Sequence, residues 1–259
     1  MQQSQERPVA IVTGASRRIG IGAATCRALA GSGHDIFFTH LQEYDRDVSV
    51  GADAEGPRAL AEELRGLGAN VAEMHADLMD PATADAILAR CTQELGAPSV
   101  LVNNAAYSTT QNWDELTPEE FDNHYLVNFR GSSLLSIAFA KQFTRGHRGR
   151  IVSMTTGQAL GPMPTELAYA ASKGAIEAFV KSFAYAVGPL GITVNAVNPG
   201  PVNTGWMTSE LKQYLEPKFA LGRIGQPDDI GKVIAFLASP AADWITGQVI
   251  NAEGGFTRD

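Results

Sequence analysis

Tyr169 and Lys173 are the two residues whose types and spacing point most directly to chemistry. They stand four positions apart in Tyr169-Ala170-Ala171-Ser172-Lys173. On a helix this spacing places both side chains on one face, about 6 Å apart along the axis. An ammonium group beside a phenol favours the phenolate and lowers a pKa that starts at about 10. The pair is therefore suited to exchanging a proton with a carbonyl or alcohol oxygen.

Thr156 is the hydroxyl residue that we expect beside this pair. It stands thirteen positions before Tyr169 and directly follows the apolar run 151–154, which predicts a buried strand. Ligands of open α/β sheets bind at the carboxyl ends of the strands. The Thr156 hydroxyl is therefore predicted to point at the same substrate oxygen, with Ser153 and Thr155 as the next candidates.

The segment Thr13-Gly14-Ala15-Ser16-Arg17-Arg18-Ile19-Gly20 lies between the first predicted strand and the first predicted helix. A glycine-bearing turn in that place lets backbone N–H groups approach a pyrophosphate, which the helix amino terminus then stabilises. Two registers are open. One ends at Gly20 and puts Arg18 where a middle glycine is expected, with its side chain either against the pyrophosphate or in solvent. The other ends with Gly20-Ile21-Gly22.

The residues after the second predicted strand indicate which dinucleotide binds. An acid that holds the ribose 2′-hydroxyl of NAD is expected there, but the chain has Thr39-His40-Leu41, and its first carboxylate is Glu43. Arg17 and Arg18 in the phosphate loop offer guanidinium groups, which suit a 2′-phosphate. The sequence therefore predicts NADP(H) as the cofactor, in preference to NAD(H).

Short apolar runs alternate with longer helical patterns along the chain, and these elements must position the residues above. Expected strands are 9–12, 36–38, 71–74, 100–102, 151–154, 192–197 and 249–251; expected helices are 19–30, 57–67, 81–95, 118–144, 168–187 and 228–237. Regular alternation of this kind means right-handed crossovers and a parallel sheet with helices on both faces. We expect a single α/β domain over 1–259, a Rossmann-type doubly wound fold of about seven strands.

One segment interrupts the alternation. Residues 40–56 are rich in charge and glycine and are longer than an ordinary connection between a strand and a helix. We expect a loop there, either beside the adenosine end of the cofactor or as a solvated insertion.

Composition excludes several classes of function. A net charge of −8 argues against nucleic acid or an anionic membrane as a partner. No apolar run approaches the roughly 18 residues that span a bilayer, and the polar residues 1–8 do not resemble a signal peptide. Cys26, Cys91 and the five histidines lack the spacing of metal ligands. We therefore expect a cytoplasmic protein without a metal site.

Taken together, these motifs resemble the short-chain dehydrogenase/reductase family over about residues 8–256. The phosphate loop resembles TGxxxGxG through Gly14 and Gly20, and Tyr169 and Lys173 resemble its YxxxK pair. The other matching motifs are Asn103-Asn104-Ala105-Ala106, Asp77-Leu78, Val127-Asn128-Phe129, Pro199-Gly200-Pro201-Val202-Asn203-Thr204, Ile245-Thr246-Gly247-Gln248 and Gly254-Gly255. The cofactor-binding residues that the resemblance implies are Gly14, Ser16, Arg17, Arg18, Ile19, Gly20, His40, Asp77, Leu78, Asn104, Ala105, Ala106, Tyr169, Lys173, Pro199, Gly200, Val202 and Thr204.

The resemblance also implies direct hydride transfer between the nicotinamide and a substrate carbon. In reduction, Tyr169 then acts as the acid, Lys173 lowers its pKa and holds the ribose, Thr156 polarises the carbonyl, and Asn128 orders a relay water. Three residues depart from the family pattern: Arg18 and Ala106 replace glycines and Thr156 replaces serine. Threonine keeps the hydroxyl but adds a methyl group and restricts χ1.

The substrate pocket is expected between 156–166 and a lid at 204–221. Trp206, Met207, Tyr214 and Phe219 form the apolar inner side of that lid in one interpretation, and interface or core residues in the other. The long predicted helices 118–144 and 168–187 resemble those that pair subunits of the family into a homotetramer, with a homodimer as the alternative.

Three functions remain open. The first is reduction of a free small ketone, or oxidation of its secondary alcohol. The second follows from the similarity of 188–200 and 221–227 to 3-oxoacyl-acyl-carrier-protein reductases. An acidic carrier protein calls for a basic patch on the enzyme. Tyr185 stands where such reductases have an arginine, so only the run Lys141 to Arg150 remains of the expected patch. The third is a dinucleotide-sensing module with weak or no catalysis.

Overall fold

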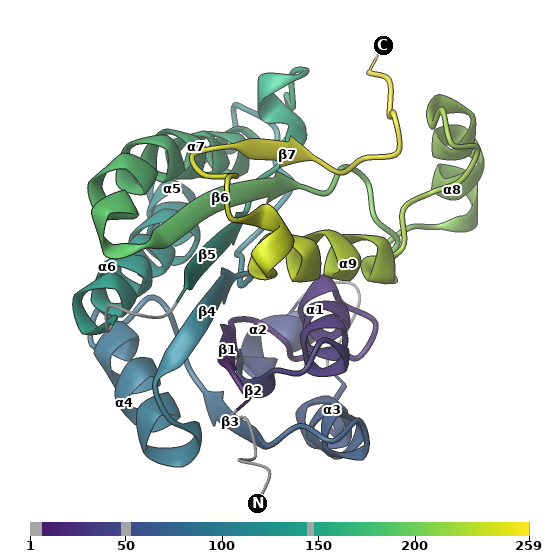
Figure 1. Cartoon of the computed structure of the whole chain (residues 1–259). Coiled ribbons are helices and arrows are strands. Elements are labelled where there is room, and N and C mark those ends of the chain that lie inside the picture. Colours follow the sequence, from purple (N-terminus) through teal and green to yellow (C-terminus); the bar gives the residue numbers. More distant parts are fainter. Residues whose placement is uncertain (1–6, 48–52, 144–147, 259) are drawn as a thin grey trace, which may run out of the picture.

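The computed structural model describes residues 7–47, 53–143 and 148–258. Seven strands form one sheet in the order β3-β2-β1-β4-β5-β6-β7, with every neighbouring pair parallel (Figure 1). The strands are β1 Val9–Val12, β2 Asp35–His40, β3 Val71–His75, β4 Pro98–Asn103, β5 Gly149–Met154, β6 Ile192–Asn198 and β7 Val249–Asn251. The predicted doubly wound fold is confirmed.

Helices cover both faces of this sheet (Figure 1). They are α1 Ile21–Gly31, α2 Gln42–Asp47, α3 Gly56–Gly66, α4 Thr83–Leu95, α5 Pro118–His124, α6 Ser132–Gln142, α7 Leu167–Val187, α8 Ser209–Leu215 and α9 Pro227–Ala238, with a π-helical turn η1 at Tyr125–Gly131 and 3-10 turns η2 Gly157–Ala159, η3 Gly188–Leu190, η4 Glu216–Lys218 and η5 Pro240–Ala242. Helices α1, α3 and α9 pack on one face, and α4, α6 and α7 on the other.

Alternating side chains of the central strands fill the two cores. Ile11 and Phe37 belong to the core under α4, α6 and α7, whereas Val12 and Phe38 belong to the core under α1, α3 and α9. All four are fully buried, because successive side chains of a strand point to opposite faces. This two-sided burial explains why the strands read as continuous apolar runs.

Two sequence-based expectations need correction. Residues 40–56 are not a loop throughout, because the short helix α2 lies within them and α3 begins at Gly56. Helix α2 has acidic residues in its first turn and Arg46 in its last, which suits the helix dipole, while Tyr44 is its only large apolar residue. The expected helix 118–144 is instead α5, the π-helical turn η1 and α6 in succession. Residues 48–52 and 144–147 lie outside the described parts of the chain.

Candidate active site

Lys173 is fixed to the end of β5 from its place on α7. Its ammonium nitrogen donates a hydrogen bond to the Met154 carbonyl at 2.9 Å, and the residue is only 2% exposed. Burial lowers the pKa of Lys173 to about 8, because the charged form loses its hydration. The same nitrogen lies 5.5 Å from the centre of the Tyr169 ring, so the predicted pair does share one face of α7.

The Tyr169 phenol is the expected proton donor, and it is held in its protonated form. Burial raises the pKa of Tyr169, and the neighbouring Glu166 carboxylate raises it further. This differs from the expectation that Lys173 lowers that pKa, because burial and the Glu166 carboxylate both disfavour the charged phenolate. As a phenol, Tyr169 is an acid ready to protonate an oxygen.

Thr156 lies in extended backbone directly before η2. Its hydroxyl makes one weak contact, with the Met163 sulfur at 3.8 Å. The buried Thr155 differs, because its hydroxyl donates to the Glu177 carboxylate at 2.9 Å. Ser153 is also buried and accepts a hydrogen bond from Asn103. Of these three hydroxyl residues, Thr156 is therefore the one best able to donate to a substrate.

Asn128 connects the π-helical turn η1 to the helix of the tyrosine. Its side chain accepts a hydrogen bond from the Tyr107 backbone N–H at 2.7 Å and donates to the Tyr107 carbonyl at 2.9 Å. It also donates to the Ser172 hydroxyl at 3.0 Å, and Ser172 donates to the Tyr169 carbonyl at 2.7 Å. Such π-helical turns are common at functional sites. The sequence predicted Asn128 but missed Tyr107 and Ser172, although Ser172 stands inside the YxxxK stretch.

His124 is a further neighbour of Tyr169 that no sequence motif indicated. The two rings meet edge to face with their centres 6.2 Å apart, and His124 is almost fully buried. Its Nδ1 lies 2.7 Å from the Glu120 carbonyl, while its Nε2 accepts from the Thr109 backbone N–H. A carbonyl only accepts, so the proton is assigned to Nδ1 and the ring to its neutral form.

The phosphate loop depends on two close backbone approaches. Gly14 has a φ of +72°, and a Cβ there would lie 2.6 Å from the Cα of Ala105; a Cβ on Gly22 would lie 2.6 Å from the Gly14 carbonyl. Gly20 caps α1, and its Cβ would meet only the Arg17 carbonyl, at 3.2 Å. Both registers considered from the sequence therefore hold in part. Gly14 and Gly22 permit the two close backbone approaches, and Gly20 is the residue from which the helix begins.

The end of β4 holds this loop in place. The Asn104 side chain donates to the carbonyls of Thr13 and Gly14, both at 2.9 Å, and the Thr13 hydroxyl accepts from the backbone N–H groups of Asn104 and Ala105. Helix α1 has no acidic residue in its first turn and no side-chain cap. Its first N–H groups are therefore available to an anion, and the loop fits a dinucleotide pyrophosphate.

The two loop arginines take different directions. Arg17 donates to the Thr204 carbonyl at 3.0 Å and lies 3.4 Å from the Asp45 carboxylate. Arg18 pairs with Asp53 at 3.0 Å, and its side chain is 53% exposed. Of the two orientations considered from the sequence, against the pyrophosphate or in solvent, the side chain therefore takes the one in solvent. No sequence motif predicted Asp45 at this loop. Helix α2 brings it to the loop, where burial raises its pKa while Ser16 and Arg17 oppose that rise.

The remaining predicted cofactor residues lie along the carboxyl ends of the strands. His40 contacts Glu73 at 2.5 Å after β2, and Asp77 accepts from the Met79 N–H after β3, beside the buried Leu78. After β6, Gly200 has a φ of +60°, and Val202 pairs with Gly225. The others, Ile19, Ala106 and Pro199, are exposed or partly exposed.

The expected lid at 204–221 includes α8 and its own small core. Met207 and Phe219 are buried there with Leu215 and Ile224. Trp206 is 46% exposed, although its indole N–H donates to the Val202 carbonyl, and Tyr214 is 61% exposed beneath Lys218. Met207 and Phe219 therefore stabilise the lid from within, whereas the other two aromatic rings face outward.

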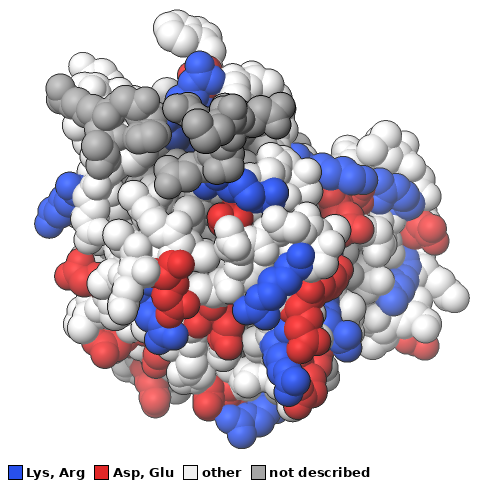
Figure 2. Space-filling view, turned by 60° about the horizontal axis from the view of Figure 1, so that its bottom comes forward, with Lys and Arg blue, Asp and Glu red and all other residues white. Residues whose placement is uncertain are grey.

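Charges on the described surface form mixed pairs. Arg148 and Arg150, the last two arginines of the basic run 141–150, both bind Asp243. Residues 144–147 of that run lie outside the described chain, and Tyr185 is 90% exposed. Figure 2 shows acidic and basic side chains interleaved over one face. Within residues 7–47, 53–143 and 148–258 there is no cluster of acidic, histidine or cysteine side chains that suits a metal ion.

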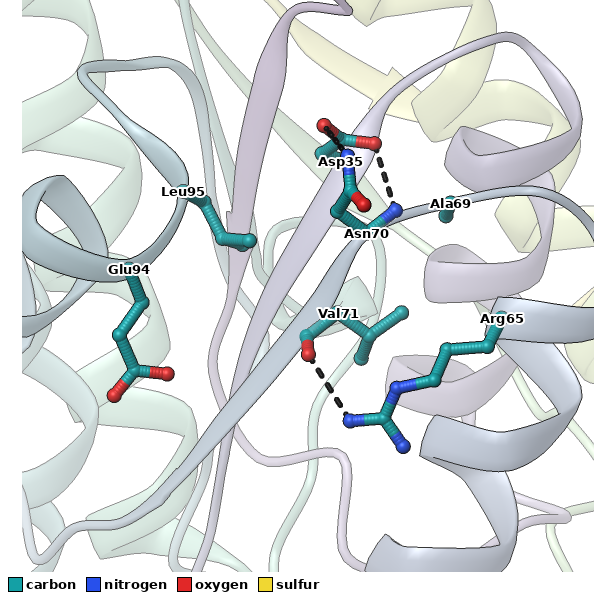
Figure 3. Close-up of a pocket in the computed structure, with 7 residues that line it drawn as sticks. All are labelled: Asp35, Arg65, Ala69, Asn70, Val71, Glu94 and Leu95. Carbon is teal, nitrogen blue, oxygen red and sulfur yellow. Dashed lines mark hydrogen bonds between the residues drawn. The ribbon is translucent and has the colours of Figure 1, made fainter.

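A pocket away from this site lies at the amino ends of β2 and β3 (Figure 3). It is lined by Asp35, Arg65, Ala69, Asn70, Val71, Glu94 and Leu95. Asp35 accepts two hydrogen bonds from Asn70 there, so its carboxylate serves the fold. The described helices include none that is long and apolar enough to cross a membrane.

Comparison with known proteins identifies the family of the chain. A family model described as enoyl-(acyl carrier protein) reductase matches residues 14–257. An uncharacterised oxidoreductase of Bacillus subtilis is 48% identical over 260 residues, covering 100% of both chains. A solved 3-oxoacyl-[acyl-carrier protein] reductase from Brucella melitensis is 32% identical with a TM-score of 0.84, covering 97% of this chain and 98% of that chain. A blue fluorescent protein from a metagenomic library, solved with NADPH, is 31% identical with a TM-score of 0.86, covering 99% and 100%.

These similarities cover nearly the whole chain, and the family model alone spans residues 14–257. The predicted resemblance, including that to 3-oxoacyl-acyl-carrier-protein reductases, is confirmed. The chain belongs to the short-chain dehydrogenase/reductase family of oxidoreductases.

Proposed function

We propose that this oxidoreductase uses NADPH to reduce a free small ketone to its secondary alcohol. The observation that carries the proposal is the Lys173 ammonium nitrogen 5.5 Å from the centre of the Tyr169 ring, with the Thr156 hydroxyl nearby in sequence and weakly engaged. The raised pKa of Tyr169 is consistent with an acid that carries its proton. A buried acid with a raised pKa retains its proton until a developing alkoxide takes it. This favours reduction over oxidation at neutral pH.

Each residue of the site has one task in this reaction. NADPH, held by the phosphate loop at Gly14–Gly20 and by Lys173, would supply the hydride that adds to the carbonyl carbon. Thr156 donates a hydrogen bond to the carbonyl oxygen, and Tyr169 transfers its proton to that oxygen as negative charge develops. Lys173, held by the Met154 carbonyl, orients the cofactor ribose. Asn128 fixes the start of α7 through Ser172 and orders the water that returns a proton to Tyr169.

The preference for NADPH rests on the phosphate loop. Arg17 and Arg18 are the cations near the expected adenosine ribose, and each has donors beyond those already engaged. The NADPH complex of a protein 31% identical to this chain supports the proposal. Asp45 opposes it locally, because its carboxylate lies 3.4 Å from Arg17, and a bound 2′-phosphate would compete for the same guanidinium.

We further propose a cytoplasmic homotetramer, or a homodimer. Phe121 and Tyr125 are about half exposed on α5 and η1, the helices expected to pair subunits, and exposed aromatic residues are typical of such interfaces. Cys26 and Cys91 are free buried thiols, which suits a reducing compartment.

Two other functions have a specific observation behind them. Reduction of a carrier-bound 3-oxoacyl group is favoured by the solved Brucella enzyme, but Tyr185 carries no charge, and Arg148 and Arg150 are both paired with Asp243. A dinucleotide sensor is favoured by the substitutions at Arg18, Ala106 and Thr156, although Arg18 points away from the loop. The intact set of Tyr169, Lys173 and Asn128 argues for turnover.

The test is a panel of small ketones with NADPH, followed by nicotinamide absorbance, with the Tyr169→Phe variant as the control. Turnover that depends on Tyr169 supports the proposal. If NADPH binds but no ketone on the panel is reduced, and the carrier-bound substrate is also inert, the sensor becomes the better description.

A further inference from the structure

The C-terminal segment, residues 253–258, joins the lid to the rest of the site. Its backbone pairs with the end of the lid through three hydrogen bonds: Leu221 N–H to Gly254, Ala220 N–H to Gly255, and Thr257 N–H to Lys218. The rings of Phe256 and Phe219 pack with their centres 5.0 Å apart. Figure 1 shows the chain leaving β7 toward the side of the molecule that carries α8.

Glu253 ties the same segment to the residues that follow β6. One of its carboxylate oxygens accepts a hydrogen bond from the Asn198 side chain at 3.0 Å. Asn198 is 1% exposed, and its own side-chain oxygen accepts from the Gly200 N–H at 3.0 Å. A Cβ on Gly200 would overlap the side chain of Glu253. Glu253 is therefore held against the segment expected to contact the nicotinamide.

Arg258 extends from this anchor onto the loop that follows Thr156. Its guanidinium binds both oxygens of Glu253, at 3.1 and 2.7 Å, and its side chain is 21% exposed. A Cβ on Gly157 would overlap the guanidinium, and one on Gly161 would lie 2.6 Å from the Arg258 Cδ. In both cases the three nearest atoms all belong to Arg258.

These two glycines are explained by Arg258 and not by backbone conformation. Neither has a positive φ, so an L-residue would adopt the same backbone without strain. The space that a side chain would need is filled by the arginine. Arg258 therefore packs closely against the loop from Gly157 to Gly161, and this loop begins directly after Thr156.

We propose that Arg258 is a positioning residue that places Thr156 for the reaction. The Glu253–Arg258 ion pair links the loop that carries Thr156 to the Asn198–Gly200 segment, which is expected to contact the nicotinamide. It thereby fixes the distance between the Thr156 hydroxyl and the cofactor. Bidentate guanidinium–carboxylate geometry suits this task, because it fixes orientation as well as separation. The inference rests on the proposed role of Thr156, so its first test is made without turnover.

That first test is hydrogen exchange in the full chain, comparing Arg258→Ala with a control variant. The reporters are the amides of Leu160 and Gly161, which both bond to the Gly157 carbonyl. Loss of a charged hydrogen-bonded pair should speed their exchange by about tenfold or more. The control, Arg58→Ala, removes an exposed pair with Glu62 on α3 and should leave them unchanged. Unchanged protection in Arg258→Ala would overturn the proposal, whether or not the protein reduces any ketone.

The second test measures kinetics on a ketone that the wild type reduces. Arg258→Ala should lower kcat by about tenfold or more, since small displacements of catalytic groups are costly, with the affinity for NADPH unchanged. Arg258→Lys, which keeps a charge on Glu253, should recover part of the rate. A variant that loses only thermal stability, with normal kcat, would show that the segment is merely structural.

A double-mutant cycle locates the effect. Gly161→Ala should reproduce the loss in kcat by displacing Arg258, while Gly66→Ala, where a Cβ meets open space, is the matched control. Combining Gly161→Ala with Arg258→Ala should cost no more than Arg258→Ala alone, because the overlap is then gone. Additive losses would show that Arg258 acts elsewhere and would overturn the assignment. The glycine variant also keeps the proposal testable if Arg258→Ala fails to fold.

Discussion

The ammonium nitrogen of Lys173 lies 5.5 Å from the centre of the Tyr169 ring and is anchored to the Met154 carbonyl. The two side chains therefore lie next to each other, and their pKa values are shifted in opposite directions. Burial lowers the pKa of the lysine and raises that of the tyrosine. Both shifts favour the uncharged forms, since a buried charge without a partner is costly.

Removing the Tyr169 hydroxyl isolates proton transfer. Tyr169→Phe should leave folding and NADPH binding nearly intact while lowering kcat by about 10²-fold or more, because only the acid is lost. Lys173→Ala should reduce both kcat and the affinity for NADPH. Steady-state kinetics and calorimetric titration separate the two effects. A Tyr169→Phe enzyme with normal turnover would refute the assignment.

The pH dependence should differ between the two directions. For ketone reduction, Tyr169 must be protonated and Lys173 charged. With a raised pKa for the tyrosine and a value of about 8 for the lysine, kcat/KM should be level at lower pH and fall as pH rises through about 8. Alcohol oxidation needs the phenolate, so its rate should be low at neutral pH and be limited by that ionisation.

Profiles of kcat/KM in both directions check this, because they report ionisations of the free enzyme. A reduction profile that stays level to about pH 10, the ordinary pKa of tyrosine, would show that the charge of Lys173 is not required. An oxidation rate already maximal at neutral pH would contradict the raised pKa of Tyr169.

The neighbouring threonines provide a matched pair. Thr156→Ser should retain activity, whereas Thr156→Val should lower kcat/KM by about 10²-fold, the typical cost of one lost hydrogen-bond donor to a developing oxyanion. Thr155→Val removes a bond to Glu177 instead and should cost about 1 kcal/mol of stability with a smaller effect on rate. If the valine at 156 is tolerated and that at 155 is not, the donor has been assigned to the wrong residue.

Much of this site was predictable because its residues lie close together in sequence or at strand ends. Tyr169 and Lys173 are four residues apart, which places them on one face of a helix. The apolar runs that precede Thr156 and Gly14 predict strands, and so place both residues at one edge of the sheet. Apolar runs gave each strand to within two residues at either end, since burial on both faces leaves a local record.

What was missed depends on contacts between distant segments. Asp45 reaches the phosphate loop only because α2 folds within a segment expected to be a loop, and His124 reaches Tyr169 from the end of α5. The partnership of Arg258 with Gly157 spans a hundred residues, and a lone arginine near the end of a chain has no local pattern. Even the pKa of Tyr169 reverses its expected direction, because burial is a tertiary property.

Cofactor choice is tested at the Arg17–Asp45 pair. Arg17→Ala should weaken NADPH by about tenfold or more, as expected for charged hydrogen bonds, and weaken NADH much less. Asp45→Asn should strengthen NADPH, because it removes a carboxylate that competes for Arg17, and leave NADH nearly unchanged. Calorimetric titration with both cofactors gives the four comparisons. Equal losses for both cofactors in Arg17→Ala would mean that its bond to Thr204, not a 2′-phosphate, explains its effect.

The choice between a free ketone and a carrier-bound substrate depends on the surface around Tyr185. An acidic carrier protein needs cations that are not already paired, but Arg148 and Arg150 both bind Asp243, and Tyr185 is exposed without charge. The same 3-oxoacyl group should therefore be reduced with similar kcat/KM on carrier protein and on a short thiol. Tyr185→Arg should then raise the rate with the carrier alone, and added salt should remove that gain, because exposed charges are screened. A large, salt-sensitive advantage for the carrier in the wild type would mean that cations elsewhere on the molecule recognise it, and the chain would then be a 3-oxoacyl-carrier reductase.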